Sequence, residues 1–204
     1  MNWLIIVIIV LVILAIACFV LYRKGKELQE KSESSQEQMR AGAQTQSLLI
    51  IDKKRMKLKE ANLRDDVIFR KATEEDKATL KEYRRLFSEE ALHETVSDED
   101  LEKKYERHFS MGYYLLEKDG KIVATASCNR HLSKGKSVGN VFTPKEERGN
   151  GYAFNLVYRI SKEFLDSGLE YCVLFTDDSN PISNHVYEKI GYERRADTME
   201  ILFV

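Results

Sequence analysis

The stretch that decides the fold runs from residue 141 to residue 192 and reads VFTPKEERGNGYAFNLVYRISKEFLDSGLEYCVLFTDDSNPISNHVYEKIGY. Apolar residues recur at helical spacing within Ala153–Phe164. Tyr171–Phe175 is a continuous apolar run of β-formers, typical of a strand that is buried on both faces. With a strand at Lys136–Thr143, this order predicts a crossover between two parallel strands, and Asn180-Pro181 then starts another helix.

The same reading extends over residues 66–204 and predicts a mixed α/β domain of order βααβββαβαβ. Acidic residues after Thr73 and after Ser97 indicate the starts of two helices. Asp119-Gly120 is typical of a hairpin turn between two strands. The expected strands are 67–72, 113–116, 121–126, 136–143, 171–175 and 192–204, and the expected helices are 73–92, 97–109, 153–164 and 180–190.

The first residues have a different character. Trp3–Tyr22 contains no charged side chain, and as a helix it spans about 30 Å, the thickness of a bilayer core. Arg23, Lys24 and Lys26 follow it at once, so residues 1–22 are predicted to be a single transmembrane helix in contact with lipid, with residues 23–204 in the cytoplasm. A cleaved signal peptide, or a lipoprotein signal ending at Cys18, is the alternative.

Residues 23–65 are expected to be a charged linker, partly helical or disordered. Within it, Leu48–Ile51 is a short apolar clump and Lys53–Lys59 is strongly basic. Such a segment suits an anionic lipid surface or a partner helix, and it equally suits a solvated helix leading into the domain.

Composition excludes several classes of protein. A net charge of -1 argues against a nucleic-acid partner held by bulk positive charge. The histidines and cysteines lack metal-ligand spacing, so no metal is expected. Cys128 and Cys172 lie among apolar neighbours and are interpreted as reduced core residues.

A glycine-rich turn lies between the expected strand and helix and reads Arg148-Gly149-Asn150-Gly151-Tyr152-Ala153. Glycines allow the backbone to approach a ligand, and the helix N-terminus behind them offers unpaired N–H groups. The turn therefore suits a phosphate or pyrophosphate, although a tight turn that merely needs glycine has the same sequence.

A second polar group follows the buried strand. Asn180, Ser183, Asn184 and Tyr187 are placed just beyond its carboxyl end, the edge at which open α/β sheets bind ligands. Tyr187 is alternatively an aromatic residue that packs its helix onto the sheet.

Together the two motifs resemble the GNAT superfamily of acyl-CoA-dependent N-acyltransferases. The turn is similar to that family's R-x-x-G-x-A pyrophosphate loop, and residues 180–192 are similar to its N-P-x-S-N-x-x-Y-x-K-x-G-Y helix. The resemblance implies that the central parallel strands splay apart to admit the pantetheine arm of acetyl-CoA. It also implies that Tyr187 protonates the departing thiolate. The implied cofactor-binding residues are Val141, Phe142 and Thr143 for pantetheine, Arg148, Gly149, Asn150, Gly151, Tyr152 and Ala153 for pyrophosphate, and Asn180 and Asn184 beside the thioester.

One expected residue is missing. Many family members carry a glutamate as general base on the strand before the loop, where this chain has Gly139-Asn140. His131 and Asp177 are candidates for that role, and a water wire or a substrate that binds as the free amine would also serve. Glu146 and Glu147 in the turn are expected to be solvated.

These observations predict a membrane-anchored N-acetyltransferase that moves acetyl from acetyl-CoA to a primary amine, of unspecified identity. A non-catalytic acyl-CoA-binding or partner-recruiting module is the main alternative. A scaffold in which only the membrane segment and linker function is the other.

Overall fold

The computed structural model describes residues 21–29, 43–56, 63–92 and 94–201. Residues Thr45–Thr198 form a compact unit. The predicted membrane helix, Trp3–Tyr22, lies outside the described residues except for its last two positions, and residues 21–29 are helical. Among the described residues, no helix combines the length and the apolar character needed to cross a bilayer.

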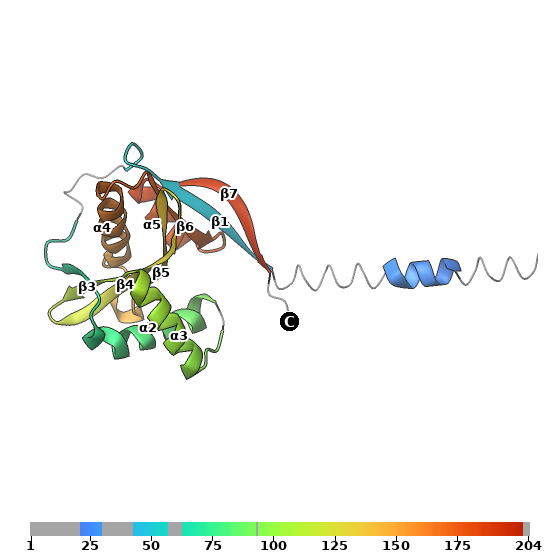
Figure 1. The fold of residues 1–204 in the computed structure, drawn as a ribbon, viewed down its shortest axis with the longest axis horizontal. Coiled ribbons are helices and arrows are strands. Elements are labelled where there is room, and N and C mark those ends of the chain that lie inside the picture. The colour runs from blue at the N-terminus through green and yellow to red at the C-terminus, as the bar shows by residue number, and fades with distance from the viewer. Residues whose placement is uncertain (1–20, 30–42, 57–62, 93, 202–204) are drawn as a thin grey trace, which may run out of the picture. The chain divides into compact units, whose positions relative to one another are not determined.

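The described part of the chain forms one mixed sheet of seven strands in the order β2-β3-β4-β5-β6-β1-β7 (Figure 1). The strands are β1 Ala43–Ile51, β2 Ile68–Lys71, β3 Tyr113–Lys118, β4 Lys121–His131, β5 Gly135–Phe142, β6 Tyr171–Asp177 and β7 Glu193–Ile201. The helices are α2 Lys77–Ala91, α3 Asp98–Met111, α4 Tyr152–Asp166 and α5 Pro181–Ile190. The predicted α/β class and the order βααβββαβαβ are confirmed from β2 to β7.

Local signals act as predicted at the helix ends and turns. Ser97 caps α3 by accepting the backbone N–H of Asp100, and Asn180 caps α5 by accepting that of Ser183. Asp119 and Gly120 both have positive φ, as the hairpin turn between β3 and β4 requires.

Strand β1 is not predicted. The expectation of a helical or disordered linker is wrong for Ala43–Ile51, which pairs antiparallel with β6 from Gln46↔Asp177 to Ile51↔Cys172. Ser47, Leu49 and Ile51 are buried while the residues between them are only partly covered, a two-residue period that the SLLII sequence conceals. The strand fills the place between β6 and β7, which a domain starting at residue 66 would leave open.

We therefore expect a chain that starts at Asp66 to lose its cooperative thermal transition, measured by circular dichroism. Loss of β1 removes the buried side chains of Leu49 and Ile51 and exposes the residues that they cover. The burial of these two side chains contributes about 3–6 kcal/mol to the free energy of unfolding. Loss of β1 also removes the ladder along one edge of β6. A chain starting at residue 42 is the control and should melt cooperatively. Equal melting of the two chains would contradict this role for β1.

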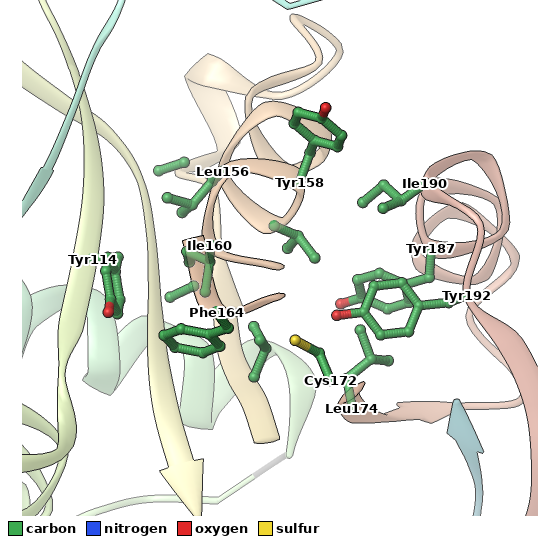
Figure 2. Close-up of a cluster of buried hydrophobic side chains, with 14 of the residues drawn as sticks. Tyr114, Leu156, Tyr158, Ile160, Phe164, Cys172, Leu174, Tyr187, Ile190 and Tyr192 are labelled. Carbon is green, nitrogen blue, oxygen red and sulfur yellow. The ribbon is translucent and has the colours of Figure 1, made fainter. Parts of the chain in front are cut away.

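The two faces of the sheet differ in character. Tyr114 packs with Phe164 of α4, and the large apolar core on that side includes Ala124, Ala126 and Cys128 of β4 (Figure 2). Tyr113, which points the other way, packs with Leu80 of α2 and Tyr105 of α3. Strands alternate, so Thr125, Ser127 and Asn129 of β4 share the face under α2 and α3. That half of the interior is polar at its centre.

Asp76 ties the start of α2 to the sheet. Its carboxylate accepts from both Nη atoms of Arg70 at 2.7 and 2.9 Å and from the Thr73 backbone N–H at 2.8 Å. These contacts, chiefly the Arg70 hydrogen bonds, lower the pKa of Asp76 to about 2. The ionised carboxylate therefore stabilises the fold at neutral pH.

We expect Asp76→Asn to lower the free energy of unfolding by about 2 kcal/mol at pH 7, measured by urea denaturation. Because the folded-state pKa is depressed, this difference is present above pH 4 and shrinks as the pH falls towards 2. Asp98→Asn is the control, since its side chain is 87% exposed and should cost under about 0.5 kcal/mol. If the free energies of unfolding of the Asp76→Asn and wild-type proteins differ as much at pH 2 as at pH 7, the ionised carboxylate of Asp76 is not the source of the stabilisation.

Candidate active site

The parallel strands β5 and β6 pair over only three positions. Their register runs from Gly135↔Tyr171 to Ser137↔Val173 and stops there. Beyond it each strand keeps its outer neighbour, because β5 stays with β4 as far as Phe142↔Thr125 and β6 stays with β1 as far as Asp177↔Gln46. The described strands thus part in the middle of the sheet, leaving the backbone of Val141–Phe142 without a partner on the β6 side.

The glycine-rich turn lies at the end of β5, where the strands have parted. Gly149 and Gly151 have φ of +80° and +75°, and a Cβ at Gly149 would meet nothing within 4 Å. In the described structure, the backbone N–H groups from Gly149 to Phe154 donate to no protein acceptor. These amides and the positive end of α4 converge on one turn, which fits a diphosphate.

Two residues that the sequence analysis missed hold this turn in shape. Asn155 is buried, donates to the Gly151 carbonyl at 3.0 Å, and accepts the backbone N–H of Arg64 at 2.7 Å. The Arg64 side chain donates to the Asn150 carbonyl and stacks over the Tyr152 ring at 5.0 Å. No pattern in the sequence points to Arg64, because its partners are 86 and 91 positions away.

The side chain of Arg148 is directed across the end of β5. Its Nε donates to the Thr143 carbonyl at 2.9 Å, and its Nη2 pairs with Glu90 of α2 at 2.5 Å. The Arg148 backbone N–H, predicted to hold the pyrophosphate, instead donates to the Lys145 carbonyl at 3.3 Å, and the guanidinium links the turn to α2.

The α5 residues are brought to the end of β6. Asn184 accepts from the Thr176 hydroxyl at 2.9 Å and donates to the Asp177 carbonyl at 3.2 Å, so it fixes α5 onto the strand. The side-chain oxygen of Asn180 caps α5. Both asparagines lie at the edge the sequence predicts, and their contact with a ligand stays a prediction.

Tyr187 is buried and packs against Tyr192, with ring centroids 6.2 Å apart. Figure 2 shows both hydroxyl groups pointing away from α5 into the surrounding cluster. The Tyr192 hydroxyl lies 2.8 Å from that of Ser161, whereas the Tyr187 hydroxyl forms no hydrogen bond with any residue that the structure describes. Burial raises the pKa of Tyr187 to about 12, so the phenol stays protonated at neutral pH.

The structure does not bring the candidate general bases, His131 and Asp177, together where β5 and β6 part. His131 pairs with Lys136 at the far end of β4, six residues or roughly 20 Å from Thr125 beside the parted strands. Asp177 ends β6 and accepts the Ser179 N–H and hydroxyl, both at 2.8 Å. The side chain of Glu146 is 63% exposed, as predicted. The prediction of a solvated side chain is wrong for Glu147, which is only 20% exposed and pairs with Lys121 at 3.0 Å.

A buried polar cluster that the sequence analysis missed lies on the α2/α3 side of the sheet, where β5 and β6 part. Asn140 has φ +49° within an irregularity of β5, where Thr125↔Phe142 and Ser127↔Gly139 leave an extra residue. Its side chain donates to Ser127 at 2.7 Å and to Asn129 at 2.9 Å. His108 of α3 lies 3.3 Å from it, and Arg84 of α2 donates to its oxygen. We call Arg84, His108, Ser127, Asn129 and Asn140 the bulge cluster.

The bulge cluster holds a neutral imidazole. Burial, followed by the charge of Arg84, lowers the pKa of His108 to about 4. No pattern in the sequence indicates that His108 belongs to this cluster, because its neighbours come from a different helix and two strands. Among the described residues, no group of three potential metal ligands occurs.

Comparison with known proteins decides the family. The model of the acetyltransferase (GNAT) family matches residues 77–192, from the start of α2 through the closing helix. The chain belongs to the GNAT acetyltransferase family. No curated protein matches it.

Solved structures share the GNAT fold. A GCN5-related N-acetyltransferase from Sphaerobacter thermophilus matches with a TM-score of 0.63 and 15% identity over 82% of this chain and 55% of its own. A GNAT acetyltransferase from Colwellia psychrerythraea matches with a TM-score of 0.60 and 17% identity over 77% and 55%. An acetyltransferase from Clostridium acetobutylicum, solved with acetyl-CoA, matches at 0.51 and 19% over 62% and 90%. The chain thus spans only about half the length of the first two.

Proposed function

We propose that the chain is a membrane-anchored N-acetyltransferase that transfers acetyl from acetyl-CoA directly to a primary amine. The observation that carries this proposal is the parting of β5 and β6 beside a turn whose amides have no protein acceptor. The backbone of Val141–Phe142 has no partner on the β6 side and suits the amide groups of pantetheine, which would add to β5 like a strand. The amides from Gly149 to Ala153 suit the diphosphate.

Tyr187 is proposed to donate a proton to the leaving thiolate. The amine nitrogen attacks the acetyl carbon, the carbon–sulfur bond breaks with its electron pair remaining on sulfur, and the nitrogen releases one proton to water. A phenol with a pKa of about 12 is protonated at pH 7 and available as a donor. It is a weaker acid than an ordinary thiol of pKa about 8.5. Its hydrogen bond therefore stabilises the charge developing on sulfur before any full transfer of the proton.

The amine must reach the thioester uncharged. At pH 7, deprotonation costs about 4.6 kcal/mol for a lysine-like amine and about 1 kcal/mol for an α-amine. With Asn140 at the place of the family's glutamate, no carboxylate of the bulge cluster supplies this step. We propose that water linked to the cluster, or binding of the free amine, provides the neutral nucleophile.

The test is turnover by the full chain in detergent, with CoA release measured by a thiol reagent across a panel of primary amines. The proposal expects CoA release that depends on the amine, together with saturable acetyl-CoA binding by calorimetry. Binding without turnover, unchanged in Tyr187→Phe, would support the non-catalytic module instead. No binding at millimolar acetyl-CoA would reject both.

Membrane anchoring is proposed from the sequence of Trp3–Tyr22 and the basic residues after it. The expected orientation places the GNAT domain on the cytoplasmic side, where acetyl-CoA is made and used. Alkaline carbonate extraction of membranes should leave the chain in the pellet, and protease added outside intact cells should not degrade the domain. Release of the chain by carbonate would contradict the anchor.

A further inference from the structure

Arg84 is a buried guanidinium with unfilled donors. Its residue is 8% exposed, and it lies with Leu80 and Ser88 on the buried face of α2. One nitrogen, Nη1, donates to the neutral side chain of Asn140. Its Nε and the Ser88 hydroxyl are buried and have no partner among the described residues. The Ser88 hydroxyl lies one helical turn from Arg84 on the same face.

The charge of Arg84 is not balanced nearby. No ion pair within the described residues includes Arg84; its guanidinium lies over the Phe87 ring, 5.1 Å from the centroid, and Glu94 acts on it only through space. Taking a cation out of water without an opposite charge beside it is costly, so a bound anion at this position would stabilise the protein. Burial accordingly lowers the pKa of Arg84, although a guanidinium keeps its proton at any physiological pH.

The position of this charge relates it to the reaction. Through Asn140, Arg84 contacts the segment of β5 that has left β6, the segment proposed to hold pantetheine. It approaches from the α2/α3 side, whereas α4 and α5 cover the other face (Figure 1). The glycine-rich turn that suits the diphosphate begins α4. Arg84 and Ser88 therefore lie on the side of β5 opposite α4 and α5, the side from which we expect an acceptor amine to approach the thioester.

We propose that Arg84 and Ser88 bind a carboxylate of the acceptor, so that the acceptors are primary amines that also carry a carboxylate, such as amino acids. This inference rests on the proposed acetyltransferase function. A carboxylate would accept from Nε of Arg84 and from the Ser88 hydroxyl, the two donors that the protein leaves unfilled. It would also balance the charge beside His108.

The test compares amines in matched pairs that differ by one carboxylate. The probes are glycine against methylamine, 4-aminobutyrate against propylamine, and lysine against 1,5-diaminopentane, with kcat/KM measured on the full chain. We expect the carboxylated member of at least one pair to be preferred by about 100-fold or more. Arg84→Met should reduce that preference to a few-fold, and Arg85→Met, an exposed neighbour on the same helix, should leave it unchanged.

Two further measurements keep the outcome clear. Because Arg84 also holds Asn140, acetyl-CoA affinity is measured in parallel, and in Arg84→Met it should fall by less than the preference for the carboxylated amine does. Ser88→Ala removes the second donor without touching Asn140, and it should reduce the preference by about 5- to 10-fold.

Several results would overturn the proposal. Amines acetylated equally well with and without a carboxylate would overturn the inference and leave the acetyltransferase intact. A preference for succinyl-CoA over acetyl-CoA that Arg84→Met abolishes would also overturn the inference, because the carboxylate bound by Arg84 would then belong to the acyl donor and not to the amine acceptor. Failure to acetylate any amine, or to bind acetyl-CoA, would defeat the proposed function itself.

Discussion

Gly151→Glu is expected to weaken acetyl-CoA binding at least about 100-fold, equivalent to about 2.7 kcal/mol, measured by calorimetry on the full chain. Gly151 has φ +75° at the N-terminus of α4, in the turn proposed to hold the diphosphate. A carboxylate there repels the ligand's negative charge and cancels the favourable field of the helix end. The backbone strain of a side chain at this φ adds roughly 1 kcal/mol against folding.

Gly120→Glu is the matched control. Gly120 has φ +76° in the hairpin turn between β3 and β4, and a Cβ there meets nothing within 4 Å, whereas one at Gly151 would lie 4.0 Å from Nδ2 of Asn155. The control variant therefore carries the same new charge and the same backbone strain away from the turn. It should bind acetyl-CoA within about 2-fold of the wild type. Equal affinities in the two variants would show that the 148–153 turn does not hold the ligand.

Tyr187→Phe is expected to lower kcat by about 100- to 10,000-fold with acetyl-CoA affinity nearly unchanged. The substitution removes only a hydroxyl that makes no hydrogen bond with the residues described, so the packing of the ring against Tyr192 is kept. Loss confined to kcat indicates a group used in the transition state. The measurement is amine-dependent CoA release under saturating acetyl-CoA.

Tyr192→Phe provides the comparison for that variant. Tyr192 is equally buried beside Tyr187, but its hydroxyl is bonded to Ser161. Removal should cost about 1 kcal/mol of stability, because the Ser161 hydroxyl keeps its bond to Val157, with kcat changed less than about 3-fold. A Tyr187→Phe enzyme as active as Tyr192→Phe would exclude Tyr187 as the proton donor.

The sequence predicts the part of the fold that is governed by local signals. The capped helix α5, the apolar strand β6 and the periodic helix α4 each depend on neighbours within a few residues. The glycine-rich turn was visible for the same reason, since its positive φ angles require glycine at fixed positions.

Strand β1 cannot be predicted from local sequence signals. Its four consecutive apolar residues, Leu48–Ile51, carry no alternation, and the flanking basic residues suggest a solvated linker. The strand forms because β6 offers an open edge about 120 to 130 positions later in the chain, with Ser47 opposite Thr176 and Ile51 opposite Cys172. Only the three-dimensional arrangement supplies that edge.

The bulge cluster could not be predicted for a related reason. Arg84, Ser127 and Asn140 look in the sequence like ordinary helix and strand residues. An extra residue in β5 and positive φ at Asn140 turn its amide inward to meet them, and neither feature leaves a sequence signal when the residue is not glycine.

Amide hydrogen exchange of the full chain, with and without saturating acetyl-CoA, shows whether the turn and the parted end of β5 hold the ligand. We expect slower exchange at Gly149–Phe154, whose amides donate to no acceptor among the described residues, and along Val141–Phe142, which has no partner on the β6 side. The hairpin at Asp119-Gly120 should exchange at the same rate in both states. Unchanged exchange at the turn and along the parted end of β5, with the ligand bound, would contradict binding of acetyl-CoA at this place.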